Sequence, residues 1–377
     1  MGGTRDVDIV VVGIGAFGAA ALYHLARDGR DVVGLEQFEI GHPNGSSHGR
    51  SRAIRTFYND PLYVRLARAA LPLWRELESA SGERLLFLPG SLFWGVPGNP
   101  WLASGLAVAD AAGTSYEALT PAAVGARFPA LHIPARTTAV HVPEGGFLDA
   151  DRCLAAMLAG ALRAGAEIRD GTPVRRIELA GSRPIVVTDD IVYRARRLIL
   201  TGGAWLPRLV PELELRLHAT RQVFFTFRPA DRAAVSPDRL PVFADLDRLF
   251  YGFPDHGPGI KIADDTAGRM VTPETVDRSI DPVEREGLTA WLRELMPNDD
   301  PVETEAGTCL YTVSPDHDFL LGPYPGRTDV FAAAGLDHGF KFSILFGRML
   351  ADLAAGGHTE QPIERFRLDR FQPAVNI

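Results

Sequence analysis

Residues 8–18 read DIVVVGIGAFG, and this stretch decides the fold. The apolar run at 8–12 predicts a strand buried on both faces, as in a parallel sheet. The small and apolar residues at 19–28 predict the helix that follows, and Gly29 ends it. A second strand is predicted at 31–35. The chain therefore begins with a βαβ unit.

The glycines between the first strand and its helix have separate functions. Gly13 permits a tight turn, Gly15 lets the backbone approach a pyrophosphate, and Gly18 lets helix and strand pack closely. Glu36 follows the second strand, about 20 residues further on, where a carboxylate accepts hydrogen bonds from ribose hydroxyls. The unit predicts a bound adenine dinucleotide, either NAD or FAD. Its position at the N-terminus and the long interrupted chain behind it favour FAD.

The rest of the chain alternates between helical and β-type stretches. A polar, glycine-rich loop is predicted at 40–50 and an amphipathic helix at 61–79. Residues 87–144 are dense in Pro, Gly and β-type residues, and they predict an inserted, mostly β region. Asp149 is expected to cap a helix that runs to Ala164.

The second half predicts a large antiparallel sheet. Residues 217–262 alternate apolar and polar side chains, and the chain closes with a strand at 330–335 and a helix at 342–355. The predicted fold is mixed α/β, with a Rossmann-type FAD-binding domain and an interleaved, mostly antiparallel substrate domain. The expected domain boundaries are 1–85, 146–215 and 318–377 for FAD binding, and 86–145 and 216–317 for the substrate.

Composition excludes several classes of protein. A net charge of −8 and a pI near 5.7 argue against a nucleic-acid partner. No apolar run approaches the ~20 residues of a membrane span, and no N-terminal signal sequence is recognisable. Two cysteines in 377 residues do not form a disulfide framework, so a cytoplasmic location is expected. The ten histidines show no metal-ligand spacing, and no metal is predicted.

Four further blocks carry a resemblance to a known family. They are NGSSHGRSRAIR at 44–55, YGFP at 251–254 with Lys261 downstream, CLYT at 309–312, and HGFKFS at 338–343. In this order, and with the N-terminal glycines, they resemble the monomeric sarcosine oxidase and N-methyltryptophan oxidase family. These are amine oxidoreductases with covalent FAD.

The resemblance implies that the Cys309 sulfur is bonded to the flavin 8α carbon. A thiolate near a flavin methyl group is a competent nucleophile. The alternative is an inert buried cysteine, the commoner fate of a lone Cys. Cys153, inside an Ala/Leu helix, is expected to be core.

The cationic residues of the matched blocks are expected to bind anions. By resemblance, Arg55 clamps the substrate carboxylate with Lys341 beside it, and Arg52 and His48 lie against the flavin. The alternative is a solvated loop face, which is the expectation for Arg50.

Lys261 is implied to activate dioxygen, because an ammonium stabilises a superoxide-like anion. Without the resemblance, it would be the solvent-facing member of an alternating strand.

Further residues are implied by the same match. Tyr251, Tyr311 and His338 are expected to line the substrate cavity, or else to be core aromatics. The remaining FAD contacts are expected at Ser46, Ser47, Val174, Gly339 and Phe340.

This chain departs from the family pattern at two places. Asp265 stands where sarcosine-type members have a histidine near the flavin, and a carboxylate there alters the local potential. The loop at 335–338 (GLDH) is one residue shorter than the usual G-F-S-G-H. Both changes reshape the pocket and leave the substrate open.

The implied activity is oxidation of a secondary or N-methylated amino acid, sarcosine-like, by FAD and dioxygen. It yields an imine, which water hydrolyses to an aldehyde and an amine, and hydrogen peroxide. One alternative is an oxidase or dehydrogenase of cyclic imino acids such as proline or pipecolate. Another is a non-catalytic flavin-binding redox subunit. A monomer is expected.

Overall fold

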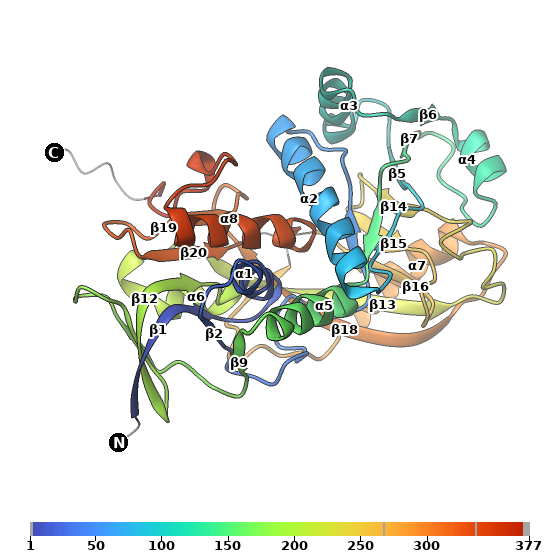
Figure 1. Cartoon of the computed structure of the whole chain (residues 1–377). Coiled ribbons are helices and arrows are strands. Elements are labelled where there is room, and N and C mark those ends of the chain that lie inside the picture. Colours follow the sequence, from blue (N-terminus) through green and yellow to red (C-terminus); the bar gives the residue numbers. More distant parts are fainter. Residues whose placement is uncertain (1–2, 267, 336–337, 372–377) are drawn as a thin grey trace.

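The computed structural model describes residues 3–266, 268–335 and 338–371, and it contains two large sheets (Figure 1). The first has eight strands, built around β1 (Gly3–Val12). On one side β1 pairs in parallel with β2 (Val32–Leu35), which pairs with β9 (Glu167–Arg169). On the other side it pairs in parallel with β12 (Ile191–Leu200). The predicted βαβ unit is thus confirmed.

The remaining strands extend this sheet from β12. β20 (Val330–Ala334) pairs in parallel with β12, and β19 (Leu320–Pro323) pairs antiparallel with β20. β11 (Ile185–Val187) and β10 (Arg176–Glu178) continue from β12 as an antiparallel ribbon. Strands from three distant parts of the chain therefore meet in one sheet.

Four helices form a layer with a single apolar core beside this sheet (Figure 1). They are α1 (Ala16–Arg27), α2 (Pro61–Ser81), α5 (Ala150–Arg163) and α8 (Ser343–Gly356). A Cβ on Gly347 of α8 would collide with Ala20 of α1, so glycine permits this close crossing. Cys153 is fully buried in the layer, as predicted.

The second sheet has nine strands and is mostly antiparallel. At its centre β13 (His218–Arg228) pairs with β18 (Val302–Val313) on one side and β16 (Ile260–Asp264) on the other. The order continues through β15 (Phe250–Phe253), β14 (Val242–Asp245) and β5 (Ser91–Gly95). The other strands are β6 (Glu117–Leu119), β7 (Thr138–Val142) and β17 (Arg269–Val271). The expected antiparallel sheet is confirmed.

A small third sheet joins β3 (Arg52–Ile54), β8 (Gly146–Leu148) and β4 (Leu86–Phe87). It holds the end of the 40–50 loop in place, and that loop has no regular structure, as predicted.

The expectation that residues 87–144 are mostly β is wrong in part. This region contains α3 (Pro100–Ala112) and α4 (Pro121–Arg127). Each begins with a proline in its first turn, behind a capping side chain: Asn99 accepts from the Leu102 N–H and Thr120 from the Ala123 N–H. The prolines that suggested β structure thus start helices.

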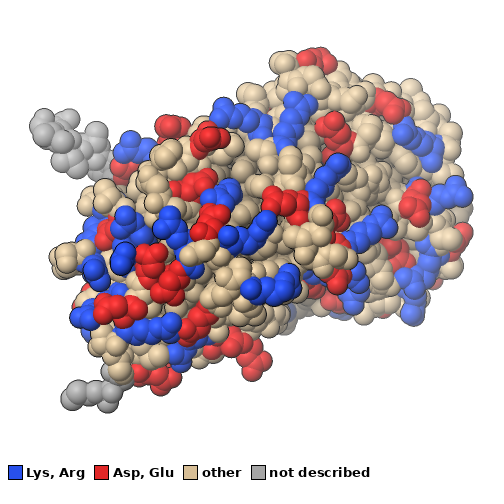
Figure 2. Space-filling view, in the orientation of Figure 1, with Lys and Arg blue, Asp and Glu red and all other residues tan. Residues whose placement is uncertain are grey.

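The sequence analysis also missed α7 (Pro282–Leu295), which begins with a capping box between Asp281 and Glu284. The mixed α/β fold with its Rossmann-type unit is confirmed, and the domain boundaries stay a prediction. Of the helices described, none has the length and apolarity that a bilayer crossing requires. On the face shown in Figure 2, basic and acidic side chains are interspersed, without a large patch of one sign.

Candidate active site

A cavity of about 600 Å³ opens where β1 and β2 end and α1 begins. Gly13 has φ +87°, and a Cβ there would lie 2.7 Å from the Thr201 carbonyl oxygen. A Cβ on Gly18 would collide with the Gly13 carbonyl. Gly13 therefore makes the turn and Gly18 permits helix and strand to touch, as predicted.

The N-terminus of α1 faces this cavity with little capping from its own residues. Gly15 is the N-cap residue and supplies no side chain. The Ala16 N–H donates to Ser47 Oγ at 2.9 Å, which brings the 40–50 loop against the helix. Free backbone N–H groups and the helix dipole favour an anion at this end.

Glu36 closes the cavity at the end of β2 and is 6% exposed. Its carboxylate accepts from the N–H groups of Ile14 (2.8 Å) and Phe38 (3.2 Å), with His42 Nε2 at 3.6 Å. Burial alone would raise the pKa of Glu36, but the bonds from His42 and the two N–H groups outweigh it and lower the pKa. The carboxylate is therefore ionised and held rigidly for a hydroxyl donor.

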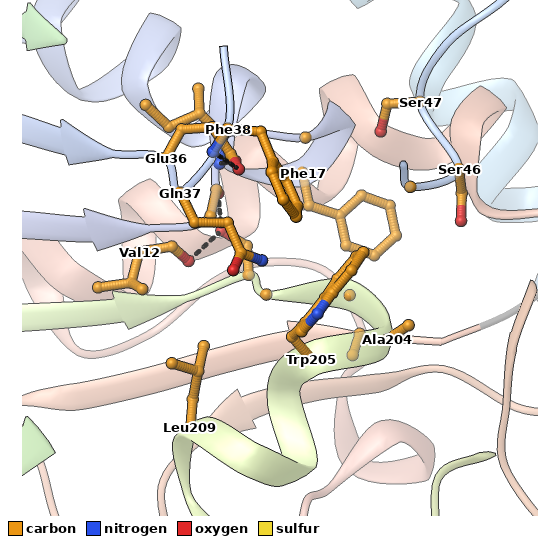
Figure 3. Close-up of a pocket in the computed structure, with 18 of the residues that line it drawn as sticks. Val12, Phe17, Glu36, Gln37, Phe38, Ser46, Ser47, Ala204, Trp205 and Leu209 are labelled. Atoms are coloured by element: carbon orange, nitrogen blue, oxygen red, sulfur yellow. Dashed lines mark hydrogen bonds between the residues drawn. The ribbon is translucent and has the colours of Figure 1, made fainter. Parts of the chain in front are cut away.

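Aromatic rings enclose the same cavity (Figure 3). The rings of Phe17, Phe38 and Trp205 converge on it, with Ser46 and Ser47 on the side away from Glu36. Phe38 and Trp205 meet edge-on, with centroids 5.6 Å apart. An adenine dinucleotide consists of flat rings, a pyrophosphate and riboses with hydroxyl groups. The cavity offers flat apolar walls for the rings, an anion-binding helix end for the pyrophosphate and a fixed carboxylate for the hydroxyls. The residues present thus fit FAD.

A second cavity, of about 100 Å³, adjoins the first, and Phe340 lines both. Its walls come from β3, the second sheet and the 3-10 helix η3 (Gly339–Phe342). Lys261 on β16 and Cys309 on β18 reach it from either side of β13, whose Thr226 and Gln222 are their paired neighbours. The β pairing therefore brings a lysine and a cysteine that are far apart in the chain to one cavity.

Arg55 lines this second cavity among aromatic rings. Its guanidinium carbon lies 4.8 Å from the ring centroid of Tyr58, 5.4 Å from that of Trp101 and 5.8 Å from that of Phe93. Its Nε is buried and has no hydrogen-bond partner among the described residues. A guanidinium donor that is buried without an acceptor, as Arg55 Nε is, lowers stability unless an anion binds it.

Lys341 brings a second positive charge to the same cavity. It is 3% exposed, and its Nζ donates to the His338 carbonyl at 2.9 Å. The Lys341 carbonyl in turn accepts from Trp74 Nε1 at 2.8 Å, so α2 fixes this turn of η3. Two cations thus line the same cavity.

Lys261 faces the cavity rather than solvent. Its Nζ donates to the Ser51 carbonyl at 3.3 Å and lies 4.7 Å from the ring centroid of Phe224. Burial, and then the charge of Arg52, lower the pKa of Lys261 to about 7. The alternative of a solvent-facing lysine on an alternating strand is therefore wrong.

Arg52 and His48 lie where the two cavities meet. Arg52 donates to the carbonyls of Ser51 (2.9 Å), Ser46 (2.9 Å) and His48 (2.5 Å), so its guanidinium braces the loop that carries it. Burial, followed by the charges of Arg52 and Lys261, lowers the pKa of His48 to about 3. His48 is therefore neutral at physiological pH. Arg50 is exposed, as expected.

A chain of polar side chains lies on another wall. Tyr251 and Tyr311 have their hydroxyls 3.3 Å apart, and the Tyr311 hydroxyl donates to Asp265 Oδ1 at 3.5 Å. His338 Nε2 lies 3.5 Å from Asp265 Oδ2. Burial, with the nearby Asp265 charge, raises the pKa of Tyr251, so this hydroxyl keeps its proton.

Comparison with known proteins agrees with this geometry. Residues 8–353 match the family described as FAD dependent oxidoreductase. The chain belongs to the FAD dependent oxidoreductase family. It is 34% identical to monomeric sarcosine oxidase of Streptomyces avermitilis, over 97% of this chain and 98% of that protein. It is 29% identical to N-methyl-L-tryptophan oxidase of Citrobacter koseri, over 97% and 99%. The resemblance predicted from the motifs is confirmed.

A solved structure is similar throughout. It is the open form of NikD, described as an unusual amino acid oxidase essential for nikkomycin biosynthesis. It superposes with a TM-score of 0.87 at 29% identity, covering 96% of this chain and 97% of that one.

The residues expected from sequence gather around the two cavities of this FAD dependent oxidoreductase. Gly18 alone lines neither, because it serves helix packing. Those that line the first are Gly13, Gly15, Glu36, Ser46, Ser47, His48, Val174, Gly339 and Phe340. Those that line the second are Arg52, Arg55, Tyr251, Lys261, Cys309, Tyr311, His338, Phe340 and Lys341. Residues 336–337 of the shortened loop lie outside the described residues.

Sequence reasoning missed part of the dinucleotide cavity. Thr201, Gly202 and Gly203 line it at the end of β12, and Thr201 Oγ1 donates to the Gly13 carbonyl at 2.7 Å. The sequence signal that could have identified these residues is the glycine pair directly after the predicted strand. Arg278 was also missed: it donates to the Asn44 carbonyl (2.6 Å) and to Thr308 Oγ1 (3.3 Å), next to Cys309. No cluster of three or more metal-ligating side chains occurs among the residues described.

Proposed function

We propose that this FAD dependent oxidoreductase is an oxidase of secondary or N-methylated amino acids that forms an imine and hydrogen peroxide. The observation that carries this proposal is Arg55. Its guanidinium is stacked among three aromatic rings in the smaller cavity, and its buried Nε has no hydrogen-bond partner within the described part of the chain. An α-carboxylate supplies the missing acceptor.

The cavity orients such a substrate by charge. Arg55 offers its carboxylate a planar donor set, and Lys341 adds a second positive charge from η3. Tyr251, whose pKa is raised, keeps its proton and offers a hydroxyl rather than a charge to the rest of the molecule, and the Tyr311 hydroxyl lies 3.3 Å from it. The positive charges of Arg55 and Lys341 favour a substrate that carries a carboxylate and whose amine is neutral. The neutral amine is the form whose adjacent C–H bond is oxidised.

The larger cavity is proposed to hold FAD. The α1 N-terminus receives the pyrophosphate, and Glu36 receives the ribose hydroxyls. FAD, when bound, takes two electrons from the carbon–nitrogen unit and passes them to dioxygen. Lys261 and Arg52, which line the smaller cavity, stabilise negative charge as dioxygen is reduced. Water then hydrolyses the imine to an aldehyde and an amine.

We further propose that Cys309 carries FAD through a thioether to the flavin 8α carbon. Cys309 lines the smaller cavity on β18 and is partly exposed to it, whereas Cys153 is fully buried. The test is acid precipitation of the purified protein. Yellow colour that stays in the pellet, and that is lost in Cys309→Ser but kept in the matched Cys153→Ser, supports the bond. Release of all flavin from the unaltered protein refutes it.

The activity is tested by peroxide release under air with sarcosine, N-methyltryptophan, proline and pipecolate, each paired with anaerobic bleaching of the flavin. N-methylated substrates should give peroxide faster than the cyclic ones. Preference for proline or pipecolate would instead support the cyclic imino acid alternative. A flavin that stays oxidised with every amine would support a non-catalytic redox subunit. Sedimentation of the same preparation tests the expected monomer.

A further inference from the structure

Cys309 lies in β18 beside a residue that is tied to the 40–50 loop. The Leu310 N–H donates to the Gly45 carbonyl at 3.4 Å, and Ser46 Oγ donates to the Leu310 carbonyl. Gly45 and Ser46 both line the dinucleotide cavity. This part of β18 is therefore fastened to the loop that borders that cavity.

Arg278 ties the same loop to β18 on the other side of Cys309. Its guanidinium donates to the Asn44 carbonyl at 2.6 Å and to Thr308 Oγ1 at 3.3 Å. Thr308 is 6% exposed and directly precedes Cys309 in the strand. The guanidinium is therefore held between the loop and the residue next to the cysteine.

The segment that carries Arg278 is itself held in place. Arg221 of β13, which is 6% exposed, donates to the Ser279 carbonyl and, at 2.7 Å, to the Glu284 carboxylate of α7. The Ser279 N–H donates to Asp277 Oδ1 at 2.8 Å. Arg278 therefore extends from a backbone that the second sheet and α7 fix.

Arg278 brings a positive charge that no carboxylate pairs with in the described part of the chain, since its two bonds go to a carbonyl and a hydroxyl. A guanidinium stays protonated in proteins. Burial lowers the pKa of Arg278, and the charge of a Cys309 thiolate opposes this effect. The two groups therefore lie close enough to interact electrostatically.

Two other titratable groups interact with the charge of Cys309. They are Lys261 of β16 and Tyr251 of β15. Burial lowers the pKa of Lys261 to about 7, so part of its charge is lost near neutral pH. Burial raises the pKa of Tyr251, which stays neutral. Among these groups, Arg278 is the one with a permanent positive charge.

We propose that Arg278 is a positioning residue for the covalent attachment of FAD, which holds a permanent positive charge next to Cys309 and stabilises its thiolate. This inference rests on the proposed thioether and adds the residue that promotes its formation. Cys309 gives up its proton, and its sulfur bonds to the flavin 8α carbon as that methyl group loses a proton. The two electrons released pass to the flavin ring and then to dioxygen, which becomes hydrogen peroxide. A cation beside Cys309 raises the share of the thiol that can react.

The test uses full-length protein that is produced without flavin and reconstituted with saturating FAD. Acid precipitation at intervals measures the covalent fraction, and saturation removes any effect of affinity for FAD. At pH 7, Arg278→Gln should slow attachment about tenfold or more, and Arg278→Lys, which keeps the charge, should stay close to the unaltered rate. The deficit in Arg278→Gln should shrink toward pH 9.5, where an ordinary thiol ionises without a nearby cation.

Arg269→Gln is the matched control, because Arg269 is an exposed residue of β17 whose charge acts on Asp277 of the same segment. This variant should attach FAD at the unaltered rate. Attachment by Arg278→Gln at the unaltered rate, or an equal deficit in Arg278→Lys, overturns the inference. A deficit of the same size at pH 7 and pH 9.5 also overturns it, because Arg278 would then serve the structure alone.

A second measurement separates this inference from the thioether itself. If the unaltered protein releases all its flavin in acid, the thioether is refuted and Cys309 is a free thiol. In a Cys153→Ser background, iodoacetamide then alkylates Cys309 alone, and the rate reports its thiolate. A rate about tenfold lower in Arg278→Gln at pH 7, restored in Arg278→Lys, supports the action of the Arg278 charge on Cys309. Equal rates in the three proteins refute it.

Discussion

At the scale of single residues, the site contains charged donors for which the described residues supply no acceptor. Arg55 is the main example, because burial of a guanidinium Nε without an acceptor lowers stability unless a ligand binds. The sequence suggested Arg55 only through the motif at 44–55. Its aromatic surroundings come from Tyr58, Phe93 and Trp101, whose convergence no local pattern predicts.

Replacing Arg55 should therefore affect the substrate and not the flavin. Arg55→Gln removes the charged donor set, and we expect KM for an N-methyl amino acid to rise about 100-fold. Steady-state kinetics measure this, with flavin content followed by absorbance. Arg50→Gln is the matched control, since Arg50 is exposed on the same loop. Unchanged KM in Arg55→Gln would count against the carboxylate clamp.

Lys261 is expected to act in the oxygen half of the reaction. Lys261→Met keeps the length of the side chain and removes its charge, so oxidation by dioxygen should slow about 100-fold or more. Anaerobic bleaching of the flavin by substrate should slow far less. Stopped-flow absorbance resolves the two half-reactions. If both slow equally, the lysine supports the site as a whole and has no particular role toward dioxygen.

At the scale of elements, the sequence predicted the helices and strands that have a strong local periodicity, and it missed helices whose signals depend on the neighbouring residues. The strand at 8–12 and the helix from Pro61 were predictable, because their patterns are strong and their ends carry clear signals. The helices at 100–112 and 121–127 were missed because proline was taken as a β or turn signal, although it starts a helix behind Asn99 and Thr120.

The contact between α1 and α8 carries a pH-dependent part of stability. His24 Nε2 bonds the Ile344 carbonyl at 3.0 Å, and burial, with the Arg348 charge, lowers the pKa of His24 to about 4. The unfolded chain takes up this proton near pH 6.5 and the folded one does not. The contribution is therefore complete above about pH 6.5 and is lost as pH falls toward 4, with about 2 kcal/mol gone at pH 5.

The prediction is tested by urea unfolding at pH 7.5 and pH 5. His24→Gln keeps a donor for the Ile344 carbonyl and does not titrate, so its free energy of unfolding should fall less between the two pH values. His358→Gln, which changes an exposed histidine, should behave like the unaltered protein. An equal fall in His24→Gln would show that other groups dominate the acid sensitivity.

At the scale of the whole molecule, the two sheets contribute different halves of the site. The first supplies the dinucleotide cavity from β1, β2 and β12, and the second supplies Lys261 and Cys309 from β16 and β18. Motif order along the chain suggested that these parts belong together. The β pairings that build the two sheets join strands far apart in the chain, such as β1 with β12 and β5 with β14, so sequence periodicity could not predict them.

A thioether at Cys309 would attach FAD covalently to the second sheet, while the first sheet would hold it by contacts alone, and this has a measurable consequence. With FAD attached, the melting temperature of the unaltered protein should not depend on added FAD. In Cys309→Ser the cofactor binds reversibly, so stability should rise with free FAD by mass action, by about 2.7 kcal/mol at 100 times its dissociation constant. Differential scanning calorimetry across an FAD series measures both. Cys153→Ser is the control and should show no dependence. If the unaltered protein also gains stability with added FAD, its cofactor is exchangeable, and the thioether at Cys309 is refuted.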